Sequence, residues 1–121
     1  NNDHSIWLID RDYKLIDFNR IFINYYQYYF KTEPVAGLNI LTNKNQQVEI
    51  QNFWKEKYDA VFEGQLVDFT ATFPYKKQNL VFRVKIFPIK KDQNIIGASV
   101  FSSNITSQVE SERELRSNQQ L

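Results

Sequence analysis

With 121 residues, 42% of them hydrophobic, the chain has the length of one domain with one core and is too short for two ordinary domains. Its 15 Lys and Arg residues nearly balance 14 Asp and Glu residues, which excludes a strong overall field that would recruit nucleic acid or an acidic membrane. The absence of cysteine excludes disulfides, thiolate nucleophiles and cysteine-ligated metals. No apolar run approaches the roughly 20 residues that span a bilayer. We expect a cytoplasmic location, no nucleic-acid partner and no direct membrane contact.

The first part of the chain predicts a hairpin followed by a helix. Two short apolar runs, residues 5–10 and 14–18, are separated by a polar turn and predict an antiparallel hairpin. Asn19 is a good N-cap residue, and aromatic side chains recur after it at every third or fourth position. This spacing predicts a helix over residues 20–30.

A second helix is predicted in the middle of the chain. Pro34 and Gly37 first indicate a turn-rich connector that extends to about residue 45 and contains at most short helical pieces. Between residues 46 and 63, apolar side chains again recur at spacings of three and four. Gly64 then provides a left-handed stop for the helix.

Three strands follow the second helix. Residues 67–73 alternate strictly between apolar and polar side chains, and apolar runs return over 80–89 and 95–101. The linkers between them are short and polar, which predicts an antiparallel meander. Together with the hairpin, these strands predict an α+β fold in which a five-stranded antiparallel sheet carries helices packed on one face.

The end of the chain changes to a charged, helix-prone segment. Ser107 and Glu110 have the spacing of a capping box, which predicts the start of a helix. Its apolar positions are too sparse for a heptad seam, so we expect this helix to be held by a partner or to continue beyond Leu121. We therefore divide the chain into a sheet-and-helix domain over 1–106 and a C-terminal linker helix over 107–121.

The order of these elements resembles the PAS domain family over residues 5–106. The segments similar to family signatures are IWLIDRDYKLIDFN for the opening hairpin, VAGLNIL for a short connector, VFEGQ for the helix-to-strand junction and FPIKKDQNIIGASVFSSNIT for the last two strands. The exit triplet of the family is usually Asp-Ile-Thr and here is Asn104-Ile105-Thr106, which lacks the charge of the aspartate. The resemblance implies a domain that senses a small ligand between its helices and its sheet.

The residue types argue against several cofactors and metals. Blue-light members of the family attach flavin to a cysteine, so the lack of cysteine excludes that photochemistry. Haem-binding members usually take an axial histidine from the central helix, whereas the lone His4 precedes the first strand, so haem is disfavoured. Asp10, Asp12 and Asp17 are better explained as hairpin carboxylates than as a metal site. We predict no metal site and no catalytic residue, and therefore no enzyme activity of the domain itself.

Aromatic side chains make up 16% of the chain and allow two interpretations. They fill the core, or they line a cavity between helices and sheet. The predicted cavity walls are Tyr25, Trp54, Tyr58, Phe69 and Phe82. A base-stacking surface is disfavoured, because the rings occupy core-facing positions, whereas the lysines that could accompany them, Lys76, Lys77, Lys90 and Lys91, lie in predicted hairpin turns.

Three functional hypotheses remain. The first is a regulatory sensor module of a larger bacterial signal-transduction protein, such as a histidine kinase of a two-component system, that binds a small ligand or partner. The change would pass through the relay residues Asn104, Ile105 and Thr106 into the terminal helix and an output domain in the same chain. The second is a ligand-free dimerisation module with a filled core, and either hypothesis predicts a homodimer. The third, a small α+β enzyme, needs an acid or base in the cavity.

Overall fold

Five antiparallel strands form one sheet in the order β2-β1-β5-β4-β3. The computed structural model describes residues 4–44 and 46–119. The strands are β1 (His4–Asp10), β2 (Leu15–Phe18), β3 (Val67–Tyr75), β4 (Gln78–Lys91) and β5 (Asn94–Asn104). Short turns connect the last three strands into the predicted meander, and the hairpin of β1 and β2 joins this meander along β5. The predicted sheet is confirmed.

The two parts of the sheet meet where β1 pairs with β5, and their backbones approach closely at Gly97. A Cβ atom on this residue would lie 2.2 Å from the carbonyl oxygen of Ile9, so a side chain would not fit there. Trp7 pairs with Val100 and Ile9 pairs with Ala98 in this register. Because side chains alternate between the faces of a strand, the register brings these four side chains to the same inner face.

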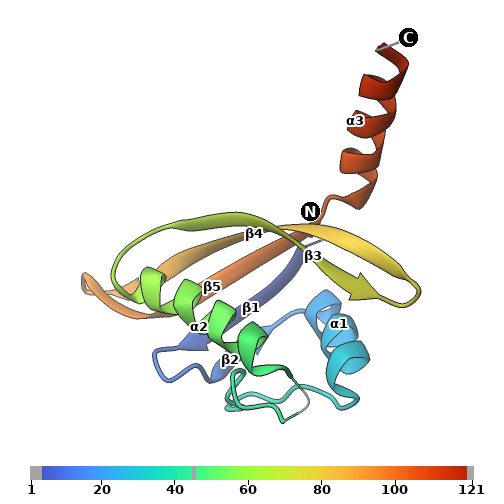
Figure 1. Ribbon diagram of the computed structural model, residues 1–121. Coiled ribbons are helices and arrows are strands. Elements are labelled where there is room, and N and C mark those ends of the chain that lie inside the picture. The colour runs from blue at the N-terminus through green and yellow to red at the C-terminus, as the bar shows by residue number, and fades with distance from the viewer. Residues whose placement is uncertain (1–3, 45, 120–121) are drawn as a thin grey trace.

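Two helices, α1 (Arg20–Phe30) and α2 (Val48–Phe62), cover this inner face of the sheet (Figure 1). Asn19 caps α1 as predicted, because its Oδ1 atom accepts a hydrogen bond of 3.0 Å from the backbone N–H of Phe22. The same oxygen accepts a bond of 3.1 Å from the N–H of Ile6 in β1. One side chain therefore starts the helix and fixes it to the sheet.

The connector between the helices consists of turns and contains no helical piece among its described residues. It runs beside β2 instead. The N–H of Leu15 donates to the carbonyl of Leu38 at 2.8 Å, and the N–H of Gly37 donates to the carbonyl of Leu15 at 2.7 Å. At the far end of α2, Gly64 has a φ of +95° and ends the helix as predicted.

The core lies between the helices and the inner face of the sheet. Its most deeply buried side chains are Tyr58, Ile9, Leu15, Ile86, Val61, Val84 and Val100. On β4 the residues between the buried positions, Arg83 and Lys85, are not part of this core, as the alternation of the strand predicts. Arg83 instead forms an ion pair of 2.9 Å with Asp68 on the neighbouring strand.

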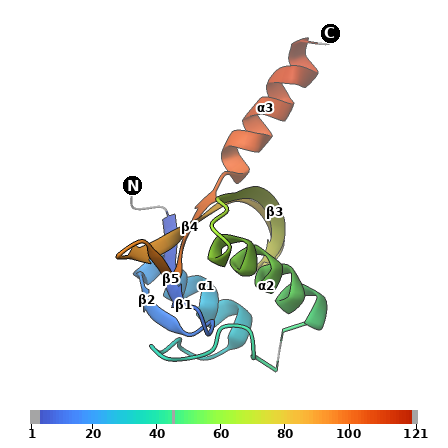
Figure 2. The same cartoon turned by 90° about the vertical axis from the view of Figure 1, so that its left-hand side faces the viewer.

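The last helix, α3 (Thr106–Gln119), extends away from the sheet and from the other two helices (Figures 1 and 2). It begins at Thr106, one residue before Ser107, and its first N–H donates to Asn104 Oδ1 at 3.1 Å. The predicted capping box of Ser107 and Glu110 makes no hydrogen bond between described residues, because Asn104 satisfies the start of the helix first. None of the described helices combines the length and apolar character needed to cross a bilayer.

Candidate functional site

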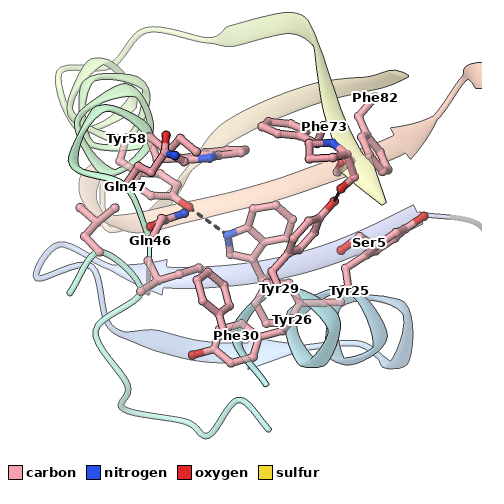
Figure 3. Close-up of a pocket in the computed structure, with 18 residues that line it drawn as sticks. Ser5, Tyr25, Tyr26, Tyr29, Phe30, Gln46, Gln47, Tyr58, Phe73 and Phe82 are labelled. Atoms are coloured by element: carbon pink, nitrogen blue, oxygen red, sulfur yellow. Dashed lines mark hydrogen bonds between the residues drawn. The ribbon is translucent and has the colours of Figure 1, made fainter. Parts of the chain in front are cut away.

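An elongated cavity of about 340 Å³ lies between α1, α2 and the sheet (Figure 3). Aromatic rings dominate its walls, and no lining residue carries a charge. The lining residues are Ser5, Trp7, Phe22, Tyr25, Tyr26, Tyr29, Phe30, Ile40, Leu41, Gln46, Gln47, Ile50, Trp54, Tyr58, Phe73, Pro74, Phe82 and Ser102. A cavity of this size and composition has the properties of a small-molecule site.

The α1 side of the cavity is built by the helical spacing of aromatic residues. Tyr25 and Tyr29 follow Phe22 at intervals of three and four, so all three lie on one face of the helix. The ring of Tyr25 meets that of Phe82 on β4 almost at right angles, with centroids 5.4 Å apart. Tyr29 donates a hydrogen bond of 2.8 Å to the carbonyl of Pro74 on β3. The sheet therefore holds the rings of α1 at the cavity wall.

The α2 side is fixed by a buried hydrogen bond. Trp7 Nε1 on β1 donates to Tyr58 Oη on α2 at 3.0 Å. Trp54, one helical turn before Tyr58, meets Trp7 edge to face with centroids 5.8 Å apart. These contacts hold α2 at a fixed position over the sheet, because neither ring can move without breaking a buried contact.

A few uncharged polar groups interrupt the apolar lining. Ser5 and Ser102 are partners across β1 and β5, and both are buried without a side-chain hydrogen bond to another described residue. The Oε1 atom of Gln46 is buried and also has no partner among the described residues. Figure 3 shows Gln46 and Tyr58 on one side of the cavity and Ser5 and Phe82 on the other. The cavity therefore offers hydrogen-bonding groups at two separate places.

Burial raises the pKa of three tyrosines of the lining, Tyr25, Tyr29 and Tyr58. It raises the pKa of Tyr58 and outweighs the hydrogen bond from Trp7, which lowers it. Burial, together with the neighbouring tyrosines, raises the pKa of Tyr29 to about 12. For Tyr25, burial and the nearby Tyr75 raise the pKa, while a hydrogen-bonding interaction with the side chain of Asn104 lowers it. All three hydroxyls are consequently neutral at physiological pH.

Four of the five predicted wall residues, Tyr25, Trp54, Tyr58 and Phe82, surround the cavity. Phe69 does not line it. Its ring packs on Trp54 at 5.8 Å and on Phe53 at 5.3 Å. Phe69 therefore supports the wall from behind Trp54.

Sequence reasoning missed the polar lining and the contribution of the connector. Ser5 and Ser102 each occupy an inward position on a strand whose neighbouring inward positions are apolar, and this pattern could have identified them. Ile40 and Leu41 reach the cavity from the connector, which has no periodicity to reveal their direction.

The predicted relay residues form a compact junction between the sheet and α3. The N–H of Ile105 donates to the carbonyl of Val81 at 2.8 Å, and the N–H of Val81 donates to Thr106 Oγ1 at 2.9 Å. Thr106 Oγ1 in turn lies 2.6 Å from Asn104 Oδ1. Val81 directly precedes Phe82, so β4 forms part of the cavity wall and holds the start of α3 at adjacent residues.

Asp10 stabilises the turn of the first hairpin. Asp10 Oδ1 accepts hydrogen bonds from the N–H groups of Asp12 at 2.8 Å and Lys14 at 3.0 Å. Within the described residues, no group of three or more potential protein ligands is arranged to hold a metal ion.

Comparisons with solved structures identify the fold. The PAS domain of BvgS from Bordetella pertussis aligns with 98% of this chain and 88% of its own at a TM-score of 0.71 and 12% identity. A sensory box sensor histidine kinase from Vibrio cholerae aligns with 84% of this chain and 77% of its own (TM-score 0.59, 18% identity). In the phage VqmA–DPO complex, the match covers all of this chain and 56% of the other (TM-score 0.69, 16% identity). A scan of family models and a search of curated proteins found no match. The predicted PAS fold is confirmed.

Proposed function

We propose that this chain, which has the PAS fold, is a regulatory sensor module of a larger signalling protein. It binds a small molecule in the aromatic cavity and passes the resulting change through the end of the sheet into α3. The observation that carries this proposal is the adjacency of Phe82 and Val81 on β4. Phe82 lines the cavity, while the carbonyl of Val81 accepts a hydrogen bond from the N–H of Ile105 and its N–H donates one to Thr106 Oγ1.

The proposed relay works by displacement of rings that contact the junction. A ligand that pushes Phe82, or Tyr25 whose ring packs on Phe82, shifts β4 beside the junction. Asn104 of the junction is the Cα partner of Phe82 in the pairing of β4 with β5. A ligand can change the conformation of the junction only if it binds one conformation more tightly than another. We propose that contact with these rings produces this difference in affinity.

The solved structures support a sensory role for the fold. They include a sensory box sensor histidine kinase and the phage VqmA–DPO complex. The chain spans 40% of the sensor region of another histidine kinase and 56% of phage VqmA. We propose that the output domain lies in the same protein and that the module itself catalyses no reaction, because its lining provides no carboxylate or imidazole.

Native mass spectrometry tests the ligand-binding part of this proposal. The freshly purified chain is measured under native conditions and again after denaturation. We expect a small non-protein mass that is bound in the first measurement and released in the second. A chain that is bare in both measurements, and whose melting temperature no compound of a metabolite panel raises, would contradict ligand sensing.

The ligand-free dimerisation module is the second candidate, because the outer face of the sheet carries exposed rings. Phe87 is 38% exposed and meets Phe101 edge to face with centroids 5.8 Å apart. Exposed aromatic pairs of this kind suit a contact with a second copy of the chain. We propose a homodimer in either case, and a bare dimer in the native measurement would favour this second function.

A further inference from the structure

The cavity suits an uncharged occupant. Its 18 lining residues include no Asp, Glu, Lys, Arg or His. The hydroxyls of Tyr29 and Tyr58 also stay neutral, because burial raises the pKa of both. A buried carboxylate or phosphate needs an opposite charge or several hydrogen-bond donors to replace its lost hydration. The described lining offers no such charge, and its hydrogen-bonding groups lie at two separate places and not around one point, so an ionised ligand would be disfavoured.

The Oε1 atom of Gln46 indicates what the occupant must supply. This oxygen is buried, belongs to a residue of the cavity lining and accepts no hydrogen bond from the described residues. Buried polar atoms in folded proteins are nearly always paired, since an unpaired one loses its hydration without compensation. An N–H or O–H group of a bound molecule would provide the missing donor.

The remaining walls indicate a flat and mainly apolar molecule. Trp54 and Phe73 are neighbouring rings of the lining, 17° from parallel and with centroids 6.4 Å apart, so together they form one flat apolar wall. Trp7 adds a third flat ring between them and α1. The volume of about 340 Å³ falls at the lower end of the range of small-molecule sites. Planar aromatic ligands gain offset-stacked and edge-to-face contacts in such a setting.

We infer that the cavity binds a neutral, mainly aromatic small molecule that donates a hydrogen bond from N–H or O–H to Gln46 Oε1. This inference rests on the proposed sensor function and adds the chemical class of the ligand. It predicts different affinities for a neutral compound with an N–H or O–H donor, a neutral compound without a donor and a negatively charged compound. Probes that differ only in these properties can test it.

The probes are indole, 1-methylindole and indole-3-carboxylate, each titrated calorimetrically into the complete 121-residue chain. Indole is neutral and has one N–H donor, 1-methylindole lacks the donor, and the carboxylate adds a negative charge. We expect indole to bind at least about tenfold more tightly than 1-methylindole, because only indole pairs the buried oxygen. Indole-3-carboxylate should bind about a hundredfold more weakly than indole.

Two neighbouring variants separate the role of Gln46 from general effects on the cavity. Gln46→Leu removes the unpaired oxygen and should weaken indole about tenfold while leaving 1-methylindole unchanged. Gln47→Leu changes the adjacent lining residue, whose oxygen is not among the buried unpaired atoms, and should preserve the preference for indole. Circular dichroism and thermal unfolding of both variants control for folding.

The outcomes distinguish this inference from the proposed function. Equal affinities for indole and 1-methylindole, or an unchanged preference in Gln46→Leu, would overturn the donor to Gln46. Tight binding of indole-3-carboxylate would overturn the neutral class, and in each of these cases the sensor function stands. A Kd of about 1 mM is weak even for a fragment-sized ligand. If no probe binds at concentrations up to this value, and native mass spectrometry also releases no small molecule, the sensor function fails as well.

Discussion

At the scale of single residues, Tyr58 joins the central helix to the sheet. Its ring is fully buried, and its hydroxyl is the hydrogen-bond acceptor for the indole N–H of Trp7. An indole N–H can only donate, so within the core it depends on this oxygen. Tyr58 is therefore a support of the cavity as well as a part of its wall.

Replacing Tyr58 with phenylalanine should destabilise the protein by about 1–2 kcal/mol, because the buried N–H of Trp7 loses its acceptor. Chemical denaturation monitored by tryptophan fluorescence measures this loss. Tyr26→Phe is the matched control, since Tyr26 is also buried but its hydroxyl bonds to no described residue, and its effect should stay within about 0.5 kcal/mol. Equal losses in the two variants would refute the role assigned to the bond.

A second residue-scale prediction concerns Asp59, which accepts hydrogen bonds from Tyr13 and Lys55. Burial alone would raise its pKa, but these two bonds and the charge of Lys55 outweigh burial and lower it. An aspartate with a lowered folded-state pKa stabilises the protein above its unfolded pKa of about 4, and this stabilisation disappears as the pH falls through the folded value. The stability advantage of the wild type over Asp59→Asn should therefore shrink as the pH falls below about 4.

Urea denaturation at a series of pH values from about 7 to 3 measures this pH dependence. Asp12→Asn removes the same charge from the nearby hairpin turn, where the carboxylate of Asp12 bonds to no described residue, and should leave the pH dependence of wild type nearly unchanged. A constant difference between wild type and Asp59→Asn across this range would be inconsistent with the assigned ion pair.

Single residues also show how far the sequence predicts the site. Tyr25, Trp54, Tyr58 and Phe82 occupy inward positions of regular elements, so periodicity alone places them at the interface of helices and sheet. Phe69 and Phe73 share the same inward parity on β3, yet only Phe73 lines the cavity, while the ring of Phe69 packs on Trp54 and Phe53 of α2. Parity gives the face of a strand, but the distance from the cavity depends on the position along the strand and on the helix that covers it.

At the scale of elements, the connection of α3 to the sheet depends on one side chain. Thr106 Oγ1 accepts the N–H of Val81 and contacts Asn104 Oδ1, so it links β4, β5 and the helix. The sequence placed a helix here because of the spacing of Ser107 and Glu110, but the observed start comes one residue earlier. That start depends on the direction of the Asn104 side chain, which the spacing of residues does not encode.

Thr106→Val retains the shape of the side chain and removes its oxygen. The amide of Val81 then has no acceptor, so its hydrogen exchange should accelerate by about tenfold, together with fraying of the first turn of α3. Hydrogen exchange followed by NMR measures both effects. Ser107→Ala should change neither, because the Ser107 side chain is exposed and bonds to no described residue. Unchanged protection of Val81 in Thr106→Val would show that this bond does not hold the junction.

At the scale of the whole molecule, the exposed rings of the outer sheet face predict self-association. Phe87→Glu places a charge in the proposed contact and should weaken a homodimer by at least about tenfold, as measured by sedimentation velocity. Leu66→Glu introduces the same charge at another exposed apolar residue outside the sheet and should leave the dimer intact. A wild-type chain that remains monomeric, or equal effects of the two variants, would exclude this face as the interface.

The whole fold was predictable to the extent that its contacts are local. Short turns predicted the meander and the hairpin, because neighbouring strands joined by a few residues pair antiparallel. The pairing of β1 with β5 joins distant parts of the chain, and no local pattern specifies it. Nor does composition decide between a filled core and a cavity, since the same aromatic rings produce either, depending on the few ångströms between α1, α2 and the sheet.

The isolated position of α3 has a geometric consequence for the whole molecule. A helix of 14 residues is about 21 Å long, at 1.5 Å per residue. Among the described residues, the start of α3 is bonded to β4, and a tilt of about 10° at Thr106 would displace the other end of the helix by roughly 3–4 Å over this length. A shift of a fraction of an ångström in β4 would then be magnified at a distance from the cavity, as by a lever that pivots on the hydrogen bonds of Val81.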